Sequence, residues 1–198
     1  MRAVWAIAAN TFREAVRDRI LYLFIGFAVV MVVSSKLFGM LTVGDETKII
    51  KDIGLAAMQF FSMLIAVMMS MILISREVDS RTVFNILAKP VRRWQFILGK
   101  YLGLVSIVAA NLVLITFVLM LTVLVVAGEI DIMLLFAAAM TMLEMLVLAA
   151  FATLFAILTR PILGSLMTLA VFVVGHMSAD LWLLTRQLPG ALTRAVIA

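Results

Sequence analysis

The sequence of 198 residues has no cysteine and one histidine. Without cysteine, the chain can form neither disulfides nor thiolate metal sites. A single histidine excludes a histidine pair as metal ligands. No GxxxxGK[ST] phosphate loop occurs either, so another chain would have to bind any nucleotide that this protein uses. We therefore expect no catalytic residues, no metal site and no cofactor in this chain.

Charged residues are also scarce. They make up 14% of the chain, and 66% of the residues are hydrophobic, whereas soluble domains are about half apolar and a quarter charged. The apolar residues form five runs long enough to cross a bilayer, which takes about 20 helical residues. We predict an all-α polytopic membrane protein with transmembrane helices at 20–41, 53–75, 101–127, 132–158 and 162–184. The net charge of +5 then reports orientation rather than nucleic-acid binding.

Residues 3–18 predict an amphipathic helix that precedes the first span. Trp5, Ala8, Phe12, Ala15 and Val16 share one face at helical spacing. Such a helix lies in the membrane interface. It can equally be a lead-in to the first span, and the two interpretations are compatible. The apolar stretch is too short for a cleavable signal peptide.

The connections between most spans are short. We predict a polar loop at 42–52, a hairpin at 128–131 and a tight turn at 159–161. With the N-terminus in the cytoplasm, eleven bases lie inside (Arg2, Arg13, Arg17, Arg19, Arg76, Arg81, Lys89, Arg92, Arg93, Lys100 and Arg160) and five outside (Lys36, Lys48, Lys51, Arg186 and Arg194). Bases favour the cytoplasmic side, so we expect a multi-pass protein of the inner (plasma) membrane with a cytoplasmic N-terminus. Five spans place the tail 185–198 outside, and we expect a sixth span beyond this chain.

Residues 76–100 form the one long polar segment between spans. We predict two short helices broken at Lys89-Pro90, because proline suits the first turn of a helix. Trp94 suits an interfacial anchor. Charged and apolar residues alternate here as in a helix that lies in a groove of a cytoplasmic partner. A helix that rests on the bilayer surface fits the same pattern equally well.

The same segment resembles the membrane subunits of type-2 ABC transporters. That family has an acidic residue, a threonine, a Pro-x-x-Arg and a Gly-Lys that enters the third span. Here these are Glu77, Thr82, Pro90 with Arg93, and Gly99-Lys100. Residues 9–20 resemble the family's N-terminal elbow helix, and the order of elements is similar along the whole chain.

The resemblance implies a permease subunit of an ATP-driven transporter, most simply an exporter. It implies a separate ATPase subunit that binds ATP and Mg²⁺, a second permease subunit that forms a homodimer, and contact with membrane lipids. Residues 78–88 would be the coupling helix that follows the ATPase. The expected contacts are Glu77, Asp79, Arg81, Thr82, Phe84, Pro90, Arg92, Arg93 and Lys100. The alternative is an anchor or sensor that recruits a cytoplasmic partner without transport. An intramembrane enzyme is disfavoured, because the sequence offers no nucleophile–base pair.

A few polar residues interrupt the apolar spans. Glu144 lies near the middle of the fourth, where a charged side chain costs roughly 2.5–3.5 kcal/mol. It therefore predicts either a substrate or proton site or a polar clamp between helices. His176 and Asp180 are four residues apart in the fifth span, which favours a His–Asp hydrogen bond over a cation site. Asn111 and Gln59 predict hydrogen bonds between helices.

Overall fold

The computed structural model describes residues 2–40, 46–79, 92–128 and 131–187. These residues form the helices α1 (Arg2–Val16), α2 (Arg19–Met40), α3 (Glu46–Asp79), α5 (Arg93–Ala127), α6 (Met133–Leu158) and α7 (Pro161–Gln187). The described parts of the chain contain no strand. The predicted all-α, polytopic architecture is confirmed.

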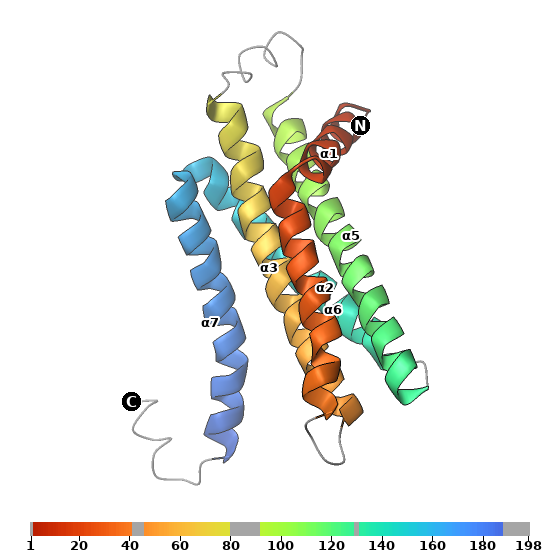
Figure 1. The fold of residues 1–198 in the computed structure, drawn as a ribbon. Helices are drawn as coiled ribbons and strands as arrows, with labels where there is room; N and C mark the ends of the chain where they lie inside the picture. Colours follow the sequence, from red (N-terminus) through yellow and green to blue (C-terminus); the bar gives the residue numbers. More distant parts are fainter. Residues whose placement is uncertain (1, 41–45, 80–91, 129–130, 188–198) are drawn as a thin grey trace.

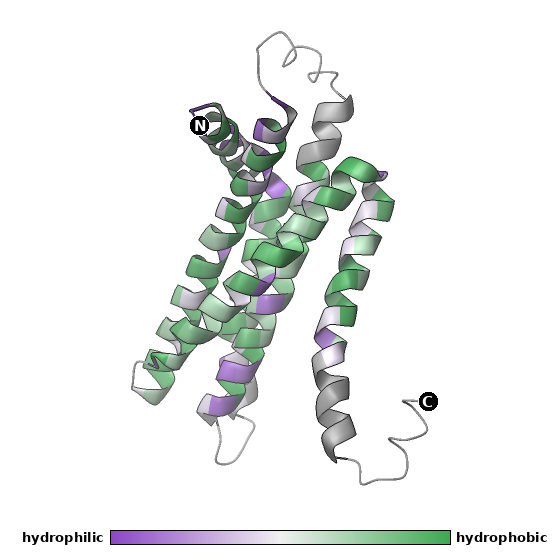
Figure 2. Ribbon diagram, turned by 180° about the vertical axis from the view of Figure 1, so that it is seen from behind, coloured by the Kyte–Doolittle hydropathy of each residue, from purple (hydrophilic) through white to green (hydrophobic). Residues whose placement is uncertain are grey.

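Among the residues that the structure describes, four helices are long and apolar enough to cross a membrane. Their spanning stretches are Arg19–Leu37, Thr47–Ile72, Trp94–Ala127 and Met133–Leu158. The fifth predicted span corresponds to α7, whose described apolar stretch, Ile162–Ser178, is shorter. In Figure 2 hydrophobic residues cover the middle of the long helices, and hydrophilic ones gather toward their ends. The hydrocarbon layer of a bilayer requires this distribution.

Helix α3 occupies the centre of the bundle. It packs against α2, α5, α6 and α7, and 56% of its spanning stretch is buried, against 22% for α2. Its buried face is formed by Met58, Ile65 and Met69 among others. Among the described helices, α7 packs substantially only against α6 and α3. It lies at the edge of the bundle in Figure 1.

Helix α1 crosses one end of the bundle at a steep angle to α2 (Figure 1). The turn between them ends with a hydrogen bond from the backbone N–H of Ile20 to the Asp18 carboxylate, 2.9 Å long. A carboxylate in this place satisfies a backbone donor at the start of a helix. The buried face of α1 is formed by Val4, Ala8, Thr11 and Ala15. It shares Ala8 and Ala15 with the predicted face, whereas Trp5 is 70% exposed.

The buried face of α1 is seated on α5 rather than on its neighbour α2. Gly99 and Gly103 on α5 make this close approach possible. A Cβ atom at Gly103 would lie 2.6 Å from the Thr11 Cβ and 3.1 Å from the Ala8 carbonyl oxygen, and one at Gly99 would lie 2.7 Å from the Ile7 Cβ. Only residues without a side chain let the two helix backbones come this close.

The connection from α5 to α6 lies at the opposite end of the bundle. Helix α5 ends at Gly128, whose φ of 72° is left-handed, a conformation that favours glycine. The Asp131 carboxylate accepts a hydrogen bond from the backbone N–H of Met133 and another, 2.5 Å long, from the Lys51 ammonium on α3. These two bonds, led by the one from Lys51, hold the pKa of the Asp131 carboxyl below its usual value of 3.8.

The turn from α6 to α7 has the predicted form. The backbone N–H and the hydroxyl of Thr159 both donate to the Phe155 carbonyl, at 2.9 and 2.7 Å. Pro161 is then the first residue of α7, a position at which no intrahelical N–H is needed.

Two predicted boundaries differ from the structure. Helix α3 begins at Glu46, so most of the predicted loop 42–52 is helical. The predicted helix pair at 76–100 is not separate from the neighbouring spans at either end. Helix α3 continues to Asp79, and α5 begins at Arg93 and runs into the third span without a break. Polar residues made 42–52 resemble a loop, but a helix that leaves the membrane can continue with polar residues on all sides.

Candidate functional site

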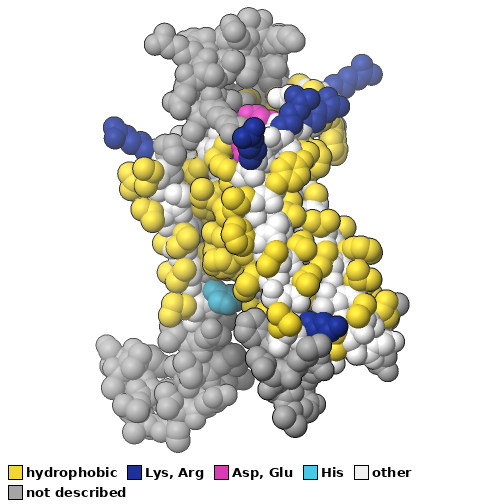
Figure 3. All heavy atoms as spheres, viewed as in Figure 1, with side chains coloured by type: hydrophobic (Ala, Val, Ile, Leu, Met, Phe, Trp, Pro, Cys, Tyr) yellow, Lys and Arg dark blue, Asp and Glu magenta, His cyan; other side chains and the backbone are white. Residues whose placement is uncertain are grey.

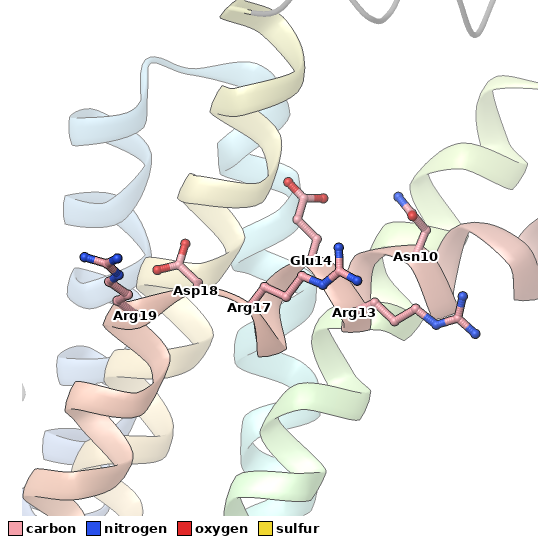
Figure 4. Close-up of a pocket in the computed structure, with 6 residues that line it drawn as sticks. All are labelled: Asn10, Arg13, Glu14, Arg17, Asp18 and Arg19. Carbon is pink, nitrogen blue, oxygen red and sulfur yellow. The ribbon is translucent and has the colours of Figure 1, made fainter.

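The end of the bundle that carries α1 holds the first candidate site. A hollow of about 670 Å³ at the α1–α2 junction is lined by Asn10, Arg13, Glu14, Arg17, Asp18 and Arg19. Figure 4 shows these side chains along α1 and across the turn, with both carboxylates on the same side. In Figure 3 Lys and Arg side chains gather at this end, above a hydrophobic belt. The three guanidinium groups are suited to bind phosphate or carboxylate groups.

Lys100 belongs to the same end but faces the protein interior. Its side chain is 5% exposed, and its ammonium nitrogen lies 3.9 Å from a Glu14 carboxylate oxygen. The pair joins α5 to α1 beside the Gly99–Gly103 contact. Lys100 was predicted to contact a cytoplasmic partner, and its burial instead makes it part of the attachment of α1 to α5.

The other residues predicted to contact a partner lie around the ends of α3 and α5. Glu77 and Asp79 are in the last turns of α3, and Arg93 is the first residue of α5. Arg92 is exposed, and its backbone N–H donates to the Gln95 side chain at 3.2 Å, which caps α5. The residues Arg81, Thr82, Phe84 and Pro90 lie outside the described part of the chain. Trp94, the predicted interfacial anchor, is 53% exposed.

The second candidate site lies within the membrane-spanning part. The Gln59 side-chain amide on α3 donates to a Glu144 carboxylate oxygen on α6 at 2.9 Å. The same amide nitrogen lies 3.4 Å from the Nδ1 of His176 on α7. A primary amide has two N–H bonds, so Gln59 can donate to both partners at once. Three helices that are distant in sequence thus meet at one polar cluster.

A hollow of about 330 Å³ opens beside this cluster, between α6 and α7. Its lining is Glu144, Val147, Leu148, Phe151, Val171, Phe172, Gly175 and His176. The rings of Phe172 and His176 are stacked, with centroids 5.7 Å apart. The chain's one histidine, cyan in Figure 3, is visible at the surface. The hollow combines one carboxylate with aromatic and aliphatic walls, which is typical of a small-molecule site.

The remaining predictions for polar residues in the spans concern Asn111 and the pair His176–Asp180. The Asn111 side-chain amide on α5 donates to the Ser62 hydroxyl on α3 at 3.0 Å, so the predicted bond between helices is present. Asp180 belongs to α7, but the placement of its side chain is outside what the structure describes, and the predicted His176–Asp180 bond stays a prediction. Nowhere in the described ranges do three or more His, Asp or Glu side chains gather as metal ligands.

Sequence reasoning found Gln59 and Glu144 as polar residues in apolar helices, but it did not pair them. It also missed the contact of Glu14 with Lys100. The separations of these partners, 85 residues for Gln59 and Glu144, leave no local pattern. The sequence could indicate only that each of these polar side chains has a partner, because a polar group in lipid is costly without a hydrogen bond or an ion pair.

The comparison with known families agrees with this architecture. The family described as "ABC-2 family transporter protein" matches residues 5–184, a range that includes most of α1 and the four spanning stretches found among the described residues. The resemblance drawn from residues 9–20 and 76–100 is confirmed. No curated protein matches the chain at a significant level.

Proposed function

The chain belongs to the ABC-2 family of transporter proteins, and on this premise we propose that it is the permease of an exporter driven by a separate ATPase subunit. Membership of the family makes it a multi-pass membrane component of an ABC transporter, which is not itself the catalyst. The direction of transport and the route of coupling are the parts that we propose.

The observation that carries the proposal is the length and placement of α3 and α5. They have 34 and 35 residues, which corresponds to about 50 Å each. The hydrocarbon layer is about 30 Å thick, so each helix is roughly 20 Å longer in total than the layer is thick. The last residue of α3, Asp79, and the first residue of α5, Arg93, flank residues 80–91 in the chain, at the end of the bundle where α1 lies (Figure 1). A partner that binds and moves residues 80–91 would therefore also move α3 and α5, which run from this segment into the membrane.

We place the coupling contact at Glu77, Asp79, Arg81, Thr82, Phe84, Pro90, Arg92 and Arg93. ATP and Mg²⁺ would be bound by the partner, and closure of the ATPase would pull α3 and α5 together. The attachment of α1 to α5 supports this route, because the Glu14–Lys100 pair and the Gly99–Gly103 contact would transmit the motion to the elbow.

The described bases support an inner-membrane protein with a cytoplasmic N-terminus. Arg13, Arg17 and Arg19 lie at the α1 end, and Lys48 and Lys51 lie at the other. The end that would meet a cytoplasmic ATPase is thus the more basic one, as the positive-inside rule expects. A second copy of the chain is the partner that we propose within the membrane.

The test is to purify the chain with its ATPase and to measure the ATPase activity of the complex in nanodiscs. Charge reversal at Arg81 and Arg92 (R81E with R92E) should remove the ATPase from the complex. The matched control is Lys48→Glu at the other end, which should leave the complex intact. Retention of the ATPase by the double variant would refute the coupling contact.

The alternative function is an anchor or sensor that recruits a cytoplasmic partner without transport. The two functions differ in the activity of the assembled complex. An exporter requires ATP hydrolysis in the complex and ATP-dependent uptake of substrate into inside-out vesicles. A stable complex without either activity would favour the anchor.

A further inference from the structure

We propose that the hollow between α6 and α7 binds a lipophilic cation, with Glu144 as its countercharge. The inference deepens the proposed function, because it names the class of molecule that the permease would carry. It depends on the residues around Glu144 and not on the contact with an ATPase.

The first argument is the charge of Glu144. It is the only charged residue of α6, 11 residues after the start of the helix at Met133, or about 17 Å into it. A charge at that depth is costly unless it is paired. Its described partner, Gln59, is neutral and gives it one hydrogen bond. Among the described side chains no ion pair reaches Glu144, so a cationic ligand would supply the missing countercharge.

The second argument is the orientation of the two polar side chains. Gln59 donates to Glu144 and lies in reach of the His176 Nδ1. These contacts fix the carboxylate and the imidazole at the edge of the same hollow, whose lining includes both. One carboxylate oxygen takes the bond from Gln59, and no bond to the other is present in the described part of the chain. The site is thus preorganised on three helices.

The third argument is the aromatic wall. Phe151 of α6 and Phe172 of α7 line the hollow with Glu144, and the Phe172 ring is stacked on His176. Aromatic faces attract cations through their quadrupole, and this attraction is strongest where water is excluded. An anionic ligand would meet the Glu144 carboxylate and the negative faces of these rings, so the wall selects for positive charge.

The fourth argument is access from the lipid. Val147, Phe151 and His176 are exposed, so the hollow opens at the lipid-facing surface. Its volume of about 330 Å³ lies within the range of small-molecule pockets. A cation that is already dissolved in the membrane could enter from the side, with its apolar body between α6 and α7 and its charge at Glu144.

The experiment uses the purified full chain in phosphatidylcholine nanodiscs and tetraphenylphosphonium as the probe. Binding is measured by equilibrium dialysis against empty nanodiscs, and tetraphenylborate serves as a probe of the same shape and opposite charge. We expect saturable binding of the cation and none of the anion. Glu144→Gln should weaken binding of the cation at least tenfold. The matched control is Asp52→Asn, which removes an exposed carboxylate of α3 and should leave binding unchanged.

A second variant tests the site by shape, with Glu144 intact. A Cβ at Gly175 meets no atom within 4 Å, and Gly175 lines the hollow. Gly175→Leu should therefore fold normally and block the probe. It decides the question if Glu144→Gln proves to be misfolded, as a purely structural clamp would predict.

Three results would overturn the inference: equal binding of tetraphenylborate, no saturable binding by the wild-type chain, or wild-type binding by Gly175→Leu. Its failure is distinguishable from failure of the proposed function. A chain that assembles an active ATPase complex but ignores the cation refutes only the site. A chain that binds the cation but assembles no ATPase refutes only the coupling.

Discussion

Replacement of Gly103 by alanine tests whether α1 is really seated on α5. The added Cβ would lie 2.6 Å from the Thr11 Cβ and Cγ2 atoms, whereas ordinary contact begins at 3.4 Å. Helix α1 would have to retreat by about 0.8 Å, and overpacking of this kind costs about 1–3 kcal/mol. Alanine regains about 1 kcal/mol through its higher helix propensity. The net expected loss of stability is about 0–2 kcal/mol.

Gly26→Ala in α2 is the matched control, because a Cβ there meets no atom within 4 Å. It should gain the helix-propensity term alone. The difference between the two variants isolates the contact with α1 and should be about 1–3 kcal/mol. For a chain of this size that corresponds to roughly 2–12 °C in the midpoint of thermal unfolding, which circular dichroism in detergent can resolve. Equal midpoints for Gly103→Ala and Gly26→Ala would refute the packing described for Gly103.

Three further predictions concern the two ends of the bundle. The ion pair of Lys51 with Asp131 should stabilise the fold above pH 3.8 and be lost as the pH falls through the lowered pKa of Asp131; the difference in melting midpoint between wild type and Asp131→Asn should therefore shrink on acidification, and a constant difference would contradict this. Asp18→Ala should cost about 1 kcal/mol by removing the cap of α2, with Asp18→Asn close to wild type in the same melting assay. Since the chain has no cysteine, Asn10→Cys and Lys48→Cys report topology directly: an impermeant maleimide should label only the latter in intact cells, and the reverse pattern would invert the proposed orientation.

The sequence was sufficient for the helices that cross the membrane. Lipid leaves an apolar run little choice but a helix, because every backbone polar group needs a partner within the segment. The ends of the helices were harder to predict. Residues 46–52 are polar and resembled a loop, but α3 begins at Glu46, since its first turns can face water without loss of backbone hydrogen bonds.

The candidate sites were only partly predictable, because they depend on which faces of the helices meet. Glu144 could be identified from the cost of a charge in an apolar run, but its partner Gln59 is 85 residues away. Trp5 was grouped with Ala8 and Ala15 on one face of α1, but it is exposed and they are buried, because hydrophobicity does not distinguish a lipid-facing side chain from one against protein. The contact of α1 with α5 depends on Gly99 and Gly103, and glycine contributes nothing to a hydrophobic pattern.

The attachment of α1 to α5 also sets an order of events during synthesis. Thr11 and Gly103 meet in the finished fold, but 92 residues separate them in the chain. At about 5–20 residues per second, the ribosome needs roughly 5–18 seconds to make the surface on which the first helix rests. During that interval α1 cannot yet rest on α5, and the membrane surface can hold it, because its exposed Trp5 and its arginines suit the interface. Helix α1 is the first element to be translated, but it can reach its final position only after the start of α5 has been made. Ribosome-bound chains that end before residue 99 should therefore leave Asn10→Cys more reactive toward maleimide than the complete chain.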